Sequence, residues 1–256
     1  MDLDLVSSCL CVCLAGILWR VSSVVLARHR KPRPTRRHSE HCHLAVFLGS
    51  GGHTSEALML LSALDFDRYS PRTYVISEGD ALSARKATAL ELSKAANPDN
   101  STVRISSPIS GYCGCLNRTC TASCLKGRLR EPYTILTIPR ARRVHQPIYT
   151  TPVTATRSLL ACIYHVTLIP LVARTSFADV LVLNGPGTCF ILCLAVLLNQ
   201  ILGIHSPRVV YVESFARVRS LSLSGKLLRP LVDRFVVQWP GLLEADRRGE
   251  CLGWLV

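Results

Sequence analysis

Residues 44–60 read LAVFLGSGGHTSEALML, and this stretch decides the fold. An apolar run at 44–48 is followed by a glycine-rich turn, and apolar residues then recur at helical spacing. This order predicts a buried strand, a tight turn and the start of a helix. Glycine allows positive φ and close approach of another molecule to the backbone, and the first N–H groups of a helix attract anions. The stretch therefore predicts an anion-binding turn at the end of a strand.

Outward from this turn, short apolar runs alternate with longer helical patterns. Several of the runs are continuous and rich in β-branched residues, which is typical of parallel strands covered on both faces. We therefore predict an α/β fold, a Rossmann-like doubly wound parallel sheet. The predicted strands are 44–48, 73–77, 134–138, 180–183, 209–212 and 235–237, and the predicted helices are 55–64, 81–96, 154–173, 189–202 and 224–233.

The N-terminal segment resembles a membrane anchor. Residues 5–27 are mostly apolar with Arg20 as their one charged residue, and they reach the length of about 20 residues that a membrane-spanning helix needs. A cleaved signal peptide is the alternative, but acidic residues precede the apolar run and basic residues follow it. The basic flank predicts that the main domain faces the cytosol. The predicted segments are an anchor at 1–27, a basic linker at 28–41 and one Rossmann-like acceptor-binding domain at 42–256, with an inserted loop expected at 98–130.

Charge and cysteine content narrow the partners. The net charge of +13 indicates anionic partners, but aromatic residues are only 6% of the chain, fewer than an RNA- or DNA-binding surface would use for stacking. We therefore expect no nucleic acid partner. Four cysteines in the loop-like region lack the paired spacing of a zinc site, so we expect no metal and leave their role open. They are Cys113, Cys115, Cys120 and Cys124.

Two further turns follow predicted strands, at 184–188 (NGPGT) and at 213–217 (ESFAR). In parallel sheets, ligands bind at the carboxyl ends of strands, where such turns lie. The first turn is not a phosphate-binding loop of the Walker A type, because no Lys-Ser/Thr pair follows its glycines. Three turns of this kind in a basic protein indicate a ligand that carries phosphate.

Three segments together resemble one family: VFLGSGGHTSEAL at 46–58, DVLVLNGPGTC at 179–189 and VYVESFARVRSLSLSGKLLRPLVDRFVVQWP at 210–240. It is the membrane-anchoring subunit of the two-subunit UDP-N-acetylglucosamine transferase of the dolichol-linked oligosaccharide pathway. The resemblance covers residues 44–96 and 134–256.

The resemblance implies the N-terminal, acceptor-binding half of a GT-B glycosyltransferase. A soluble catalytic subunit that binds UDP-GlcNAc would supply the other half. The pair would add the second GlcNAc to GlcNAc-diphosphodolichol at the cytosolic face of the endoplasmic reticulum membrane. The chain would cross that membrane once and would use no cofactor. We expect it to be inactive alone, since no further strand–helix series follows residue 237.

The same resemblance suggests roles for particular residues. We expect the general base to be His53 or Glu213, and the choice stays open. The acceptor pyrophosphate is expected at Gly49, Ser50, Gly51, Gly52, Thr54, Gly185, Gly187 and Thr188. The apolar surface near the C-terminus is expected to bind the partner, through Leu252, Trp254, Leu255 and Val256.

One alternative function stays open. A free-standing, membrane-anchored Rossmann enzyme could use another nucleotide cofactor, with Glu78 or Asp80 as the acid that binds its ribose. The absence of a second half and the family segments argue against it. Contact of the apolar helix 159–172 with the bilayer is also left open, since this apolar length is too short to span.

Overall fold

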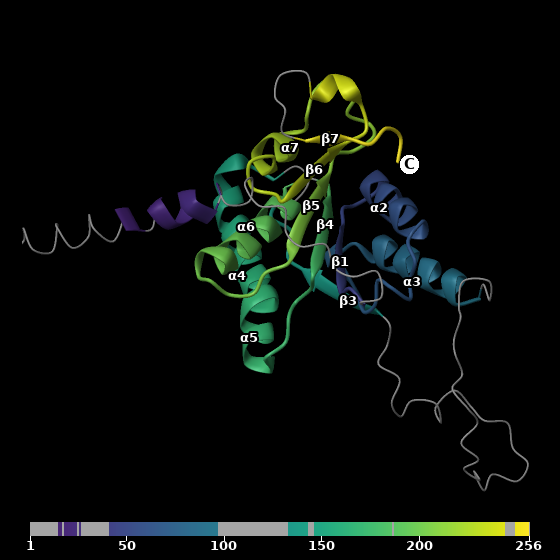
Figure 1. Ribbon diagram of the computed structural model, residues 1–256, viewed down its shortest axis with the longest axis horizontal. Coiled ribbons are helices and arrows are strands. Elements are labelled where there is room, and N and C mark those ends of the chain that lie inside the picture. The colour runs from purple at the N-terminus through teal and green to yellow at the C-terminus, as the bar shows by residue number, and fades with distance from the viewer. Residues whose placement is uncertain are drawn as a thin grey trace, which may run out of the picture.

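The computed structural model describes residues 15–16, 18–24, 26, 41–96, 133–142, 146–185, 187–243 and 249–255. Its centre is a sheet of seven parallel strands in the order β3-β2-β1-β4-β5-β6-β7 (Figure 1). The order reverses between β1 and β4, as the doubly wound fold requires, and the predicted fold class is confirmed. The strands are β1 (Leu44–Leu48), β2 (Arg72–Ser77), β3 (Tyr133–Ile138), β4 (Val180–Asn184), β5 (Arg208–Val212), β6 (Arg234–Val237) and β7 (Glu250–Cys251).

Helices cover both faces of this sheet (Figure 1). The first pair, α2 (Gly52–Ser62) and α3 (Ala81–Ala96), lies on one face. The other face is covered by α4 (Thr151–Ile163), the π-helical segment η3 (Tyr164–Leu168), α5 (Ile169–Ala173), α6 (Thr188–Ile201) and α7 (Leu223–Leu228). Two short 3-10 helices are η2 (Ile148–Thr150) and η4 (Pro240–Leu242).

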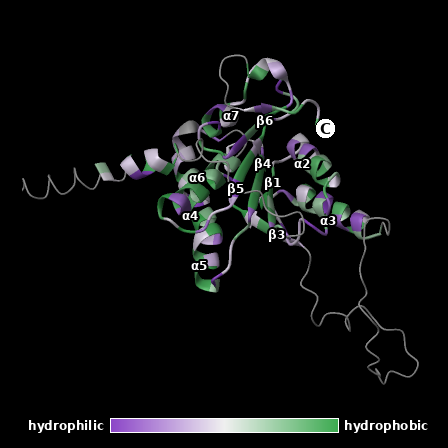
Figure 2. Ribbon diagram, in the orientation of Figure 1, coloured by the Kyte–Doolittle hydropathy of each residue, from purple (hydrophilic) through white to green (hydrophobic). Residues whose placement is uncertain are grey.

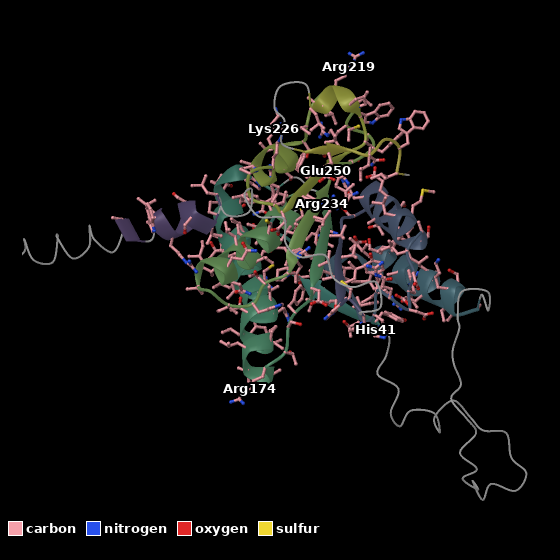
Figure 3. The ribbon with its side chains drawn as sticks, viewed as in Figure 1. His41, Arg174, Arg219, Lys226, Arg234 and Glu250 are labelled. Carbon is pink, nitrogen blue, oxygen red and sulfur yellow. The ribbon has the colours of Figure 1, made fainter. Side chains whose placement is uncertain are left out.

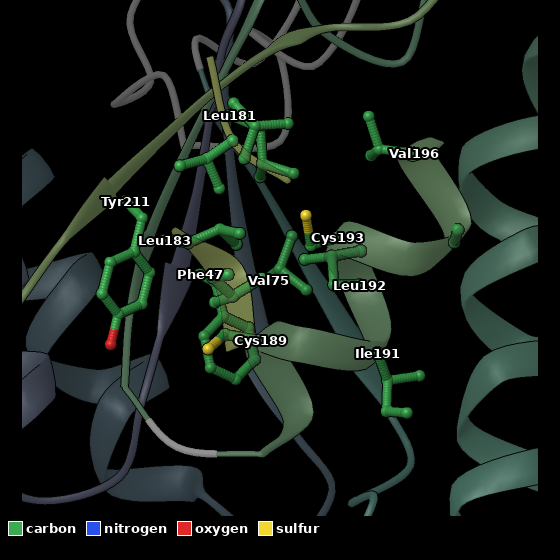
Figure 4. Packing of buried hydrophobic residues seen from close by; sticks show 14 of the residues in the cluster. Phe47, Val75, Leu181, Leu183, Cys189, Ile191, Leu192, Cys193, Val196 and Tyr211 are labelled. Atoms are coloured by element: carbon green, nitrogen blue, oxygen red, sulfur yellow. The ribbon is translucent and has the colours of Figure 1, made fainter. Parts of the chain in front are cut away.

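Alternate residues of the strands build two separate cores. Phe47 and Leu183 face α6, where they meet Cys189 and Cys193 (Figure 4). Their neighbours along the strand, such as Val46, pack against α2 and α3 on the opposite face. Because both faces of the central strand β1 are covered, all five of its residues are apolar and buried, which gives the continuous run seen in the sequence.

The predicted helix 154–173 differs from the observed one in its middle. Pro170 has no N–H to donate to the carbonyl of Val166, four residues earlier. That carbonyl instead accepts a hydrogen bond from Asn199 Nδ2 on α6, at 3.2 Å. The backbone here widens into the π-helical turn of η3, and Thr167 Oγ1 donates to Asn199 Oδ1 at 2.5 Å. A side chain of the neighbouring helix thus stabilises the irregular turn.

Other element bounds also differ from the prediction; helix α2, for example, spans Gly52–Ser62 where the prediction gave 55–64. Helix α7 ends at Leu228 and not at residue 233, because Pro230 cannot donate a helical hydrogen bond. The sheet continues past β6 with β7, whose two residues pair in parallel with Val236 and Val237. The prediction missed β7 because two residues are too few to show a period.

The outer surface of α4, η3 and α5 carries an apolar stripe, made of the exposed side chains of Val153, Leu160, Tyr164, Leu168 and Val172. The apolar character of these helices is visible in Figure 2. Residues 151–173 form a helical stretch of 23 residues that is long and apolar enough to cross a membrane, and an 18-residue window within it has a mean hydropathy of 1.4. The prediction had considered only 159–172 and had judged it too short. Only 22% of that window is buried within the protein.

The predicted anchor lies largely outside the described residues. Residues 18–24 are helical and extend away from the side of the sheet that α4 and α6 cover (Figure 1). Arg20 Nε donates to the carbonyl of Ile201 at 3.2 Å, at the end of α6. A cation at this position complements the negative end of the helix dipole.

Candidate functional site

The three predicted turns follow β1, β4 and β5, which are neighbours in the sheet. Because the strands are parallel, the turns meet at one edge, formed by the carboxyl ends. Figure 3 shows the two ends of the molecule: His41 before β1 and Arg174 after α5 lie at one end, and Arg219 after β5 lies at the other. The turns therefore lie at the Arg219 end.

The first two turns are packed directly on each other. A Cβ atom on Gly49 would lie 2.8 Å from Cβ of His53 and 3.1 Å from the carbonyl oxygen of Asn184. A Cβ atom on Gly185, which has a φ of 129°, would lie 3.3 Å from Cα of Gly49. These two glycines are thus explained by contact between the turns, without reference to a ligand.

Three other glycines face open space. Around Gly51, Gly52 and Gly187, no heavy atom of the described residues outside the adjoining backbone lies within 4 Å of the position that a Cβ would take. Gly51 has a φ of 68°, which side chains rarely adopt, and it precedes α2. Helices α2 and α6 both begin without a side-chain cap and without an acidic residue in the first turn. Their first N–H groups, beside open glycines, suit an anion.

The structure places the two threonines of the predicted phosphate site differently. Thr54 is buried, and its hydroxyl bonds to the carbonyl of Gly49 and, at 2.6 Å, to Ser83 Oγ. Thr188 is buried as well, and its hydroxyl accepts from the backbone N–H of Ala141 at 3.2 Å. Both side chains hold loops in place and do not reach the exposed surface. The two hydroxyls are thus engaged with neighbouring loops, and the predicted contact of these residues with phosphate stays a prediction.

His53 is the half-buried member of a hydrogen-bonded chain across all three turns. Its Nδ1 lies 2.8 Å from Oδ1 of Asn184, and Nδ2 of Asn184 donates to Oε2 of Glu56 at 3.0 Å. Oε1 of Glu56 accepts from Oγ of Ser214 at 2.8 Å. Within the part of the chain that the structure describes, Nε2 of His53 makes no hydrogen bond. This ring nitrogen remains available to a ligand.

The sequence prediction did not assign Glu56, Asn184 or Ser214 to the site. Glu56 lies three residues after His53 at the start of a predicted helix, so both side chains share one helix face. That spacing was the available signal for Glu56. The pairing with Asn184 could not be read from the sequence, since 128 residues separate the two.

Glu213, the rival candidate for the base, is almost fully buried, with 1% of its surface exposed. Its carboxylate accepts hydrogen bonds from the backbone N–H groups of Ser214 and Ser222, both at 3.1 Å, and from the Ser222 hydroxyl at 3.0 Å. The Tyr211 hydroxyl contacts it at 3.4 Å, and burial raises the pKa of that phenol well above its usual range. These donors hold the carboxylate beside the β5 loop, and its predicted acid–base role stays a prediction.

Cationic side chains lie beside the same edge. Lys86 Nζ donates to Ser55 Oγ at 2.9 Å, which places an ammonium group at the first turn of α2. Arg140 follows β3 and donates from Nε to the carbonyl of Glu78 at 2.9 Å. These charges favour a polyanionic ligand at this end of the sheet.

Asp80 and Glu78, the two acids considered for binding the ribose of a nucleotide cofactor, lie in different environments. Asp80 is buried, and its carboxylate accepts from the backbone N–H and the hydroxyl of Ser83, at 3.2 and 2.7 Å. It caps α3 and is not exposed to a ribose. Glu78 is exposed at the end of β2. Of these two acids, Glu78 is the one exposed enough to bind a ribose, as the alternative function would require.

Three aromatic side chains, called here the aromatic group, cluster at the surface near the C-terminus: Phe215, Trp239 and Trp254. Trp239 lies 5.2 Å from Phe215 and 5.8 Å from Trp254, measured between ring centroids. Trp254 is 73% exposed and Leu252 is 58% exposed. Leu255 is half-buried, with its N–H donating to Gln238 Oε1 at 3.2 Å. Two of the four residues predicted to bind a partner therefore present large apolar side chains to solvent.

Some predicted features lie outside the described residues. They are Val256, the loop 98–130 with its four cysteines, and the linker 28–40. In the ranges that the structure does describe, no three His, Cys, Asp or Glu side chains gather where a metal could bind.

Comparison with known proteins gives consistent matches. Residues 44–110 and 115–255 match the family described as "Oligosaccharide biosynthesis protein Alg14 like". Proteins named "UDP-N-acetylglucosamine transferase subunit ALG14" are similar over most of their length. The protein of Cryptococcus neoformans (strain JEC21) is 45% identical, over 80% of this chain and 77% of that protein. The Schizosaccharomyces pombe protein is 43% identical (82% and 82%), and the human protein is 38% identical (85% and 84%).

Among solved structures, MurG of Acinetobacter baumannii superposes with a TM-score of 0.47 at 11% sequence identity. The match covers 83% of this chain and 46% of the MurG chain.

Proposed function

The chain belongs to the Alg14 family of oligosaccharide biosynthesis proteins, and from this premise we propose that it is the acceptor-binding subunit of a UDP-GlcNAc transferase. It anchors the complex in the endoplasmic reticulum membrane and recruits a soluble catalytic subunit that binds UDP-GlcNAc. The joint reaction adds the second GlcNAc to GlcNAc-diphosphodolichol during synthesis of the N-glycan precursor. No nucleic acid, metal or further cofactor takes part.

One observation is the main support for the proposed acceptor-binding role. Gly51, Gly52 and Gly187 leave open space beside two helix starts that have no side-chain cap, at the edge where the three turns meet. Backbone N–H groups in this arrangement bind phosphate oxygens. The pyrophosphate of the acceptor is expected there, together with exposed Ser50. Lys86 and Arg140 add positive charge to the same edge.

The apolar stripe supports a position against the membrane. Arg157 and Arg174 are exposed, and no charged residue lies between them in the sequence. The exposed side chains of this interval are apolar or amphipathic, and Val172 is 84% exposed. Such a helix can lie in the interface, with its apolar side in the acyl region and its arginines at the headgroups. The helical residues 18–24 leave the protein from the same side (Figure 1).

This placement connects the membrane to the proposed acceptor site. The polypeptide runs along α4, η3 and α5 from the carboxyl edge of the sheet toward its amino edge. At the beginning of α4, Thr154 Oγ1 donates to the carbonyl of Ala141 at 2.8 Å, and the N–H of Ala141 binds Thr188 at the start of α6. A lipid tail beside the apolar stripe would therefore lead to the glycine turns. The family relationship and this continuity together favour a polyprenyl acceptor.

The exposed aromatic group is the proposed contact with the soluble subunit. Trp254 and Leu252 are too large and apolar to leave in water without a partner, and they lie beside β7 at the edge of the sheet. Predicted partner residues Leu255 and Val256 extend the same segment.

The test is reconstitution in membranes of stated composition. The full chain in phosphatidylcholine vesicles is combined with the soluble protein that co-purifies with it, with UDP-[14C]GlcNAc and with GlcNAc-diphosphodolichol. Transfer of label to lipid is expected only when both proteins are present. Turnover by this chain alone, or an equal rate when the partner is supplied without it, would refute the proposal. RNA in place of the lipid acceptor is the control for non-specific binding of anions.

A further inference from the structure

The side chain of Glu56 lies behind the site and not in it. It is half-buried on α2, and its two oxygens are occupied by Asn184 from the β4 turn and Ser214 from the β5 turn. Asn184, fully buried, bonds in turn to Nδ1 of His53. The three turns that form the proposed site are thus joined through one carboxylate. This inference rests on the proposed function in one respect, namely that His53 faces the acceptor.

The hydrogen-bonding capacity of each group fixes the order of donors and acceptors in the series Glu56, Asn184, His53. An ionised carboxylate only accepts hydrogen bonds. The Asn184 amide must therefore turn its NH₂ group toward Glu56 and its oxygen toward His53. An amide oxygen only accepts, so Nδ1 of His53 must carry the hydrogen. The neutral ring then has its lone pair on Nε2, the nitrogen that makes no hydrogen bond within the described residues.

We infer that Glu56 is a positioning residue that acts through Asn184 to hold His53 in the Nδ1–H tautomer, so that Nε2 can accept the proton of the acceptor hydroxyl. As this proton passes to Nε2, the hydroxyl oxygen bonds to the anomeric carbon of the donor sugar. The bond from that carbon to UDP breaks, and UDP leaves with the electron pair. The imidazolium formed is stabilised by the amide oxygen on Nδ1.

Glutamine at position 56 should reverse this order without breaking the chain of hydrogen bonds. The hydroxyl oxygen of Ser214 already accepts from the N–H of Ala216 at 3.3 Å, and its hydrogen points to position 56. The side-chain oxygen of glutamine would keep that hydrogen bond, which turns its NH₂ group toward Asn184. The Asn184 amide must then flip, present its own NH₂ to His53 and select the Nε2–H tautomer.

The first measurement reads the tautomer directly. Full-length chain labelled with [15N]histidine is placed in lipid nanodiscs, and two-bond 1H–15N correlation spectra are recorded about two pH units above the ordinary histidine pKa, where neutral rings predominate. A His53→Gln variant assigns the His53 signal. Wild type should show hydrogen on Nδ1, and Glu56→Gln should show hydrogen on Nε2. Adding Ser214→Ala to Glu56→Gln removes the bias and should give a mixture of both forms.

The second measurement is turnover in the reconstituted two-subunit complex. Glu56→Gln should lower kcat by about 10²- to 10⁴-fold, the usual contribution of a general base, with little change in the KM for the lipid acceptor. Glu78→Gln makes the same charge change at an exposed position of the same sheet edge and should alter neither the spectrum nor kcat.

The outcomes separate this inference from the proposed function. An unchanged Nδ1–H signal in Glu56→Gln would overturn the inference, and so would a reversed tautomer with an unchanged kcat. A wild-type complex that transfers no sugar to the lipid would contradict the proposed function instead, and the spectra would still decide whether Glu56 sets the tautomer.

Discussion

Replacement of Gly52 by leucine should separate ligand binding from folding. Gly52 is the first residue of α2, and a Cβ atom there would lie more than 4 Å from every described heavy atom outside the adjoining backbone. Its φ is not in the positive range that favours glycine. Glycine in a helix costs up to about 1 kcal/mol relative to a good helix former. In a domain of this size, 1 kcal/mol corresponds to about 2–4 °C, so Gly52→Leu should shift Tm by between zero and about +4 °C.

The same change should weaken acceptor binding. The new side chain occupies the open space beside the first N–H groups of α2, where the pyrophosphate is proposed to bind. Loss of one hydrogen bond to a charged group costs about 1.5–3 kcal/mol. At about 1.4 kcal/mol for each factor of ten, the KM for the lipid acceptor should rise by about 10- to 100-fold. The KM for UDP-GlcNAc should change little, because the donor is proposed to bind the other subunit.

The assay is initial-rate kinetics of the reconstituted complex, combined with thermal unfolding of the same samples. Gly49→Ala is the matched control, because its Cβ would overlap His53 and the Asn184 carbonyl. Overpacking of this kind costs about 1–3 kcal/mol, or about 2–12 °C in Tm. An unchanged acceptor KM in Gly52→Leu would refute the assignment of the pyrophosphate to this turn, and a large loss of Tm would refute the reading of the space as open.

Three further predictions concern other surfaces of the protein. Trp254→Ser should release the soluble subunit from membranes in a flotation assay. Leu223→Ser, which changes an equally exposed apolar side chain elsewhere on the surface, should not. Val172→Glu in a chain without residues 1–27 should reduce binding to lipid vesicles, whereas Leu92→Glu on the opposite face should not, and equal binding by both would contradict a membrane role for the apolar stripe. Burial lowers the pKa of His43 from its ordinary 6.5, against the opposing effect of Asp179, so the unfolded chain binds more protons than the folded one. Stability should therefore fall as pH decreases below about 6.5, and His43→Gln should flatten that decline in urea unfolding curves recorded across this range.

The first turn shows how much of the fold could be predicted from the sequence. Residues 44–60 predicted the strand, the turn and the helix, and β1 has the predicted bounds. Helix α3 also has its predicted bounds, because its apolar pattern ends where polar residues begin. Prediction succeeded where one local period, of two or 3.6 residues, decided the structure.

Burial could not be read from the same local signals. Thr54 and Glu213 occupy ligand-like positions in the sequence, yet both side chains turn into the protein and bond to its loops. Glu56 and Asn184 were not assigned because their contact joins segments far apart in the chain. Which side chain of a turn faces a ligand depends on the packing between turns. That packing cannot be read from a single sequence.

The cross-linking of the three turns also has a thermodynamic consequence. Glu56 ties the β4 and β5 turns to α2, and Gly49 rests on Gly185, so the proposed site is shaped before a ligand arrives. The conformational entropy of ordering these loops is then lost during folding and not during binding. Binding of the acceptor headgroup should accordingly show only a small ordering entropy and little change in the hydrogen exchange of the loop amides. In the proposed complex, a preorganised acceptor-binding half would leave the opening and closing of each catalytic cycle to the interface between the two subunits.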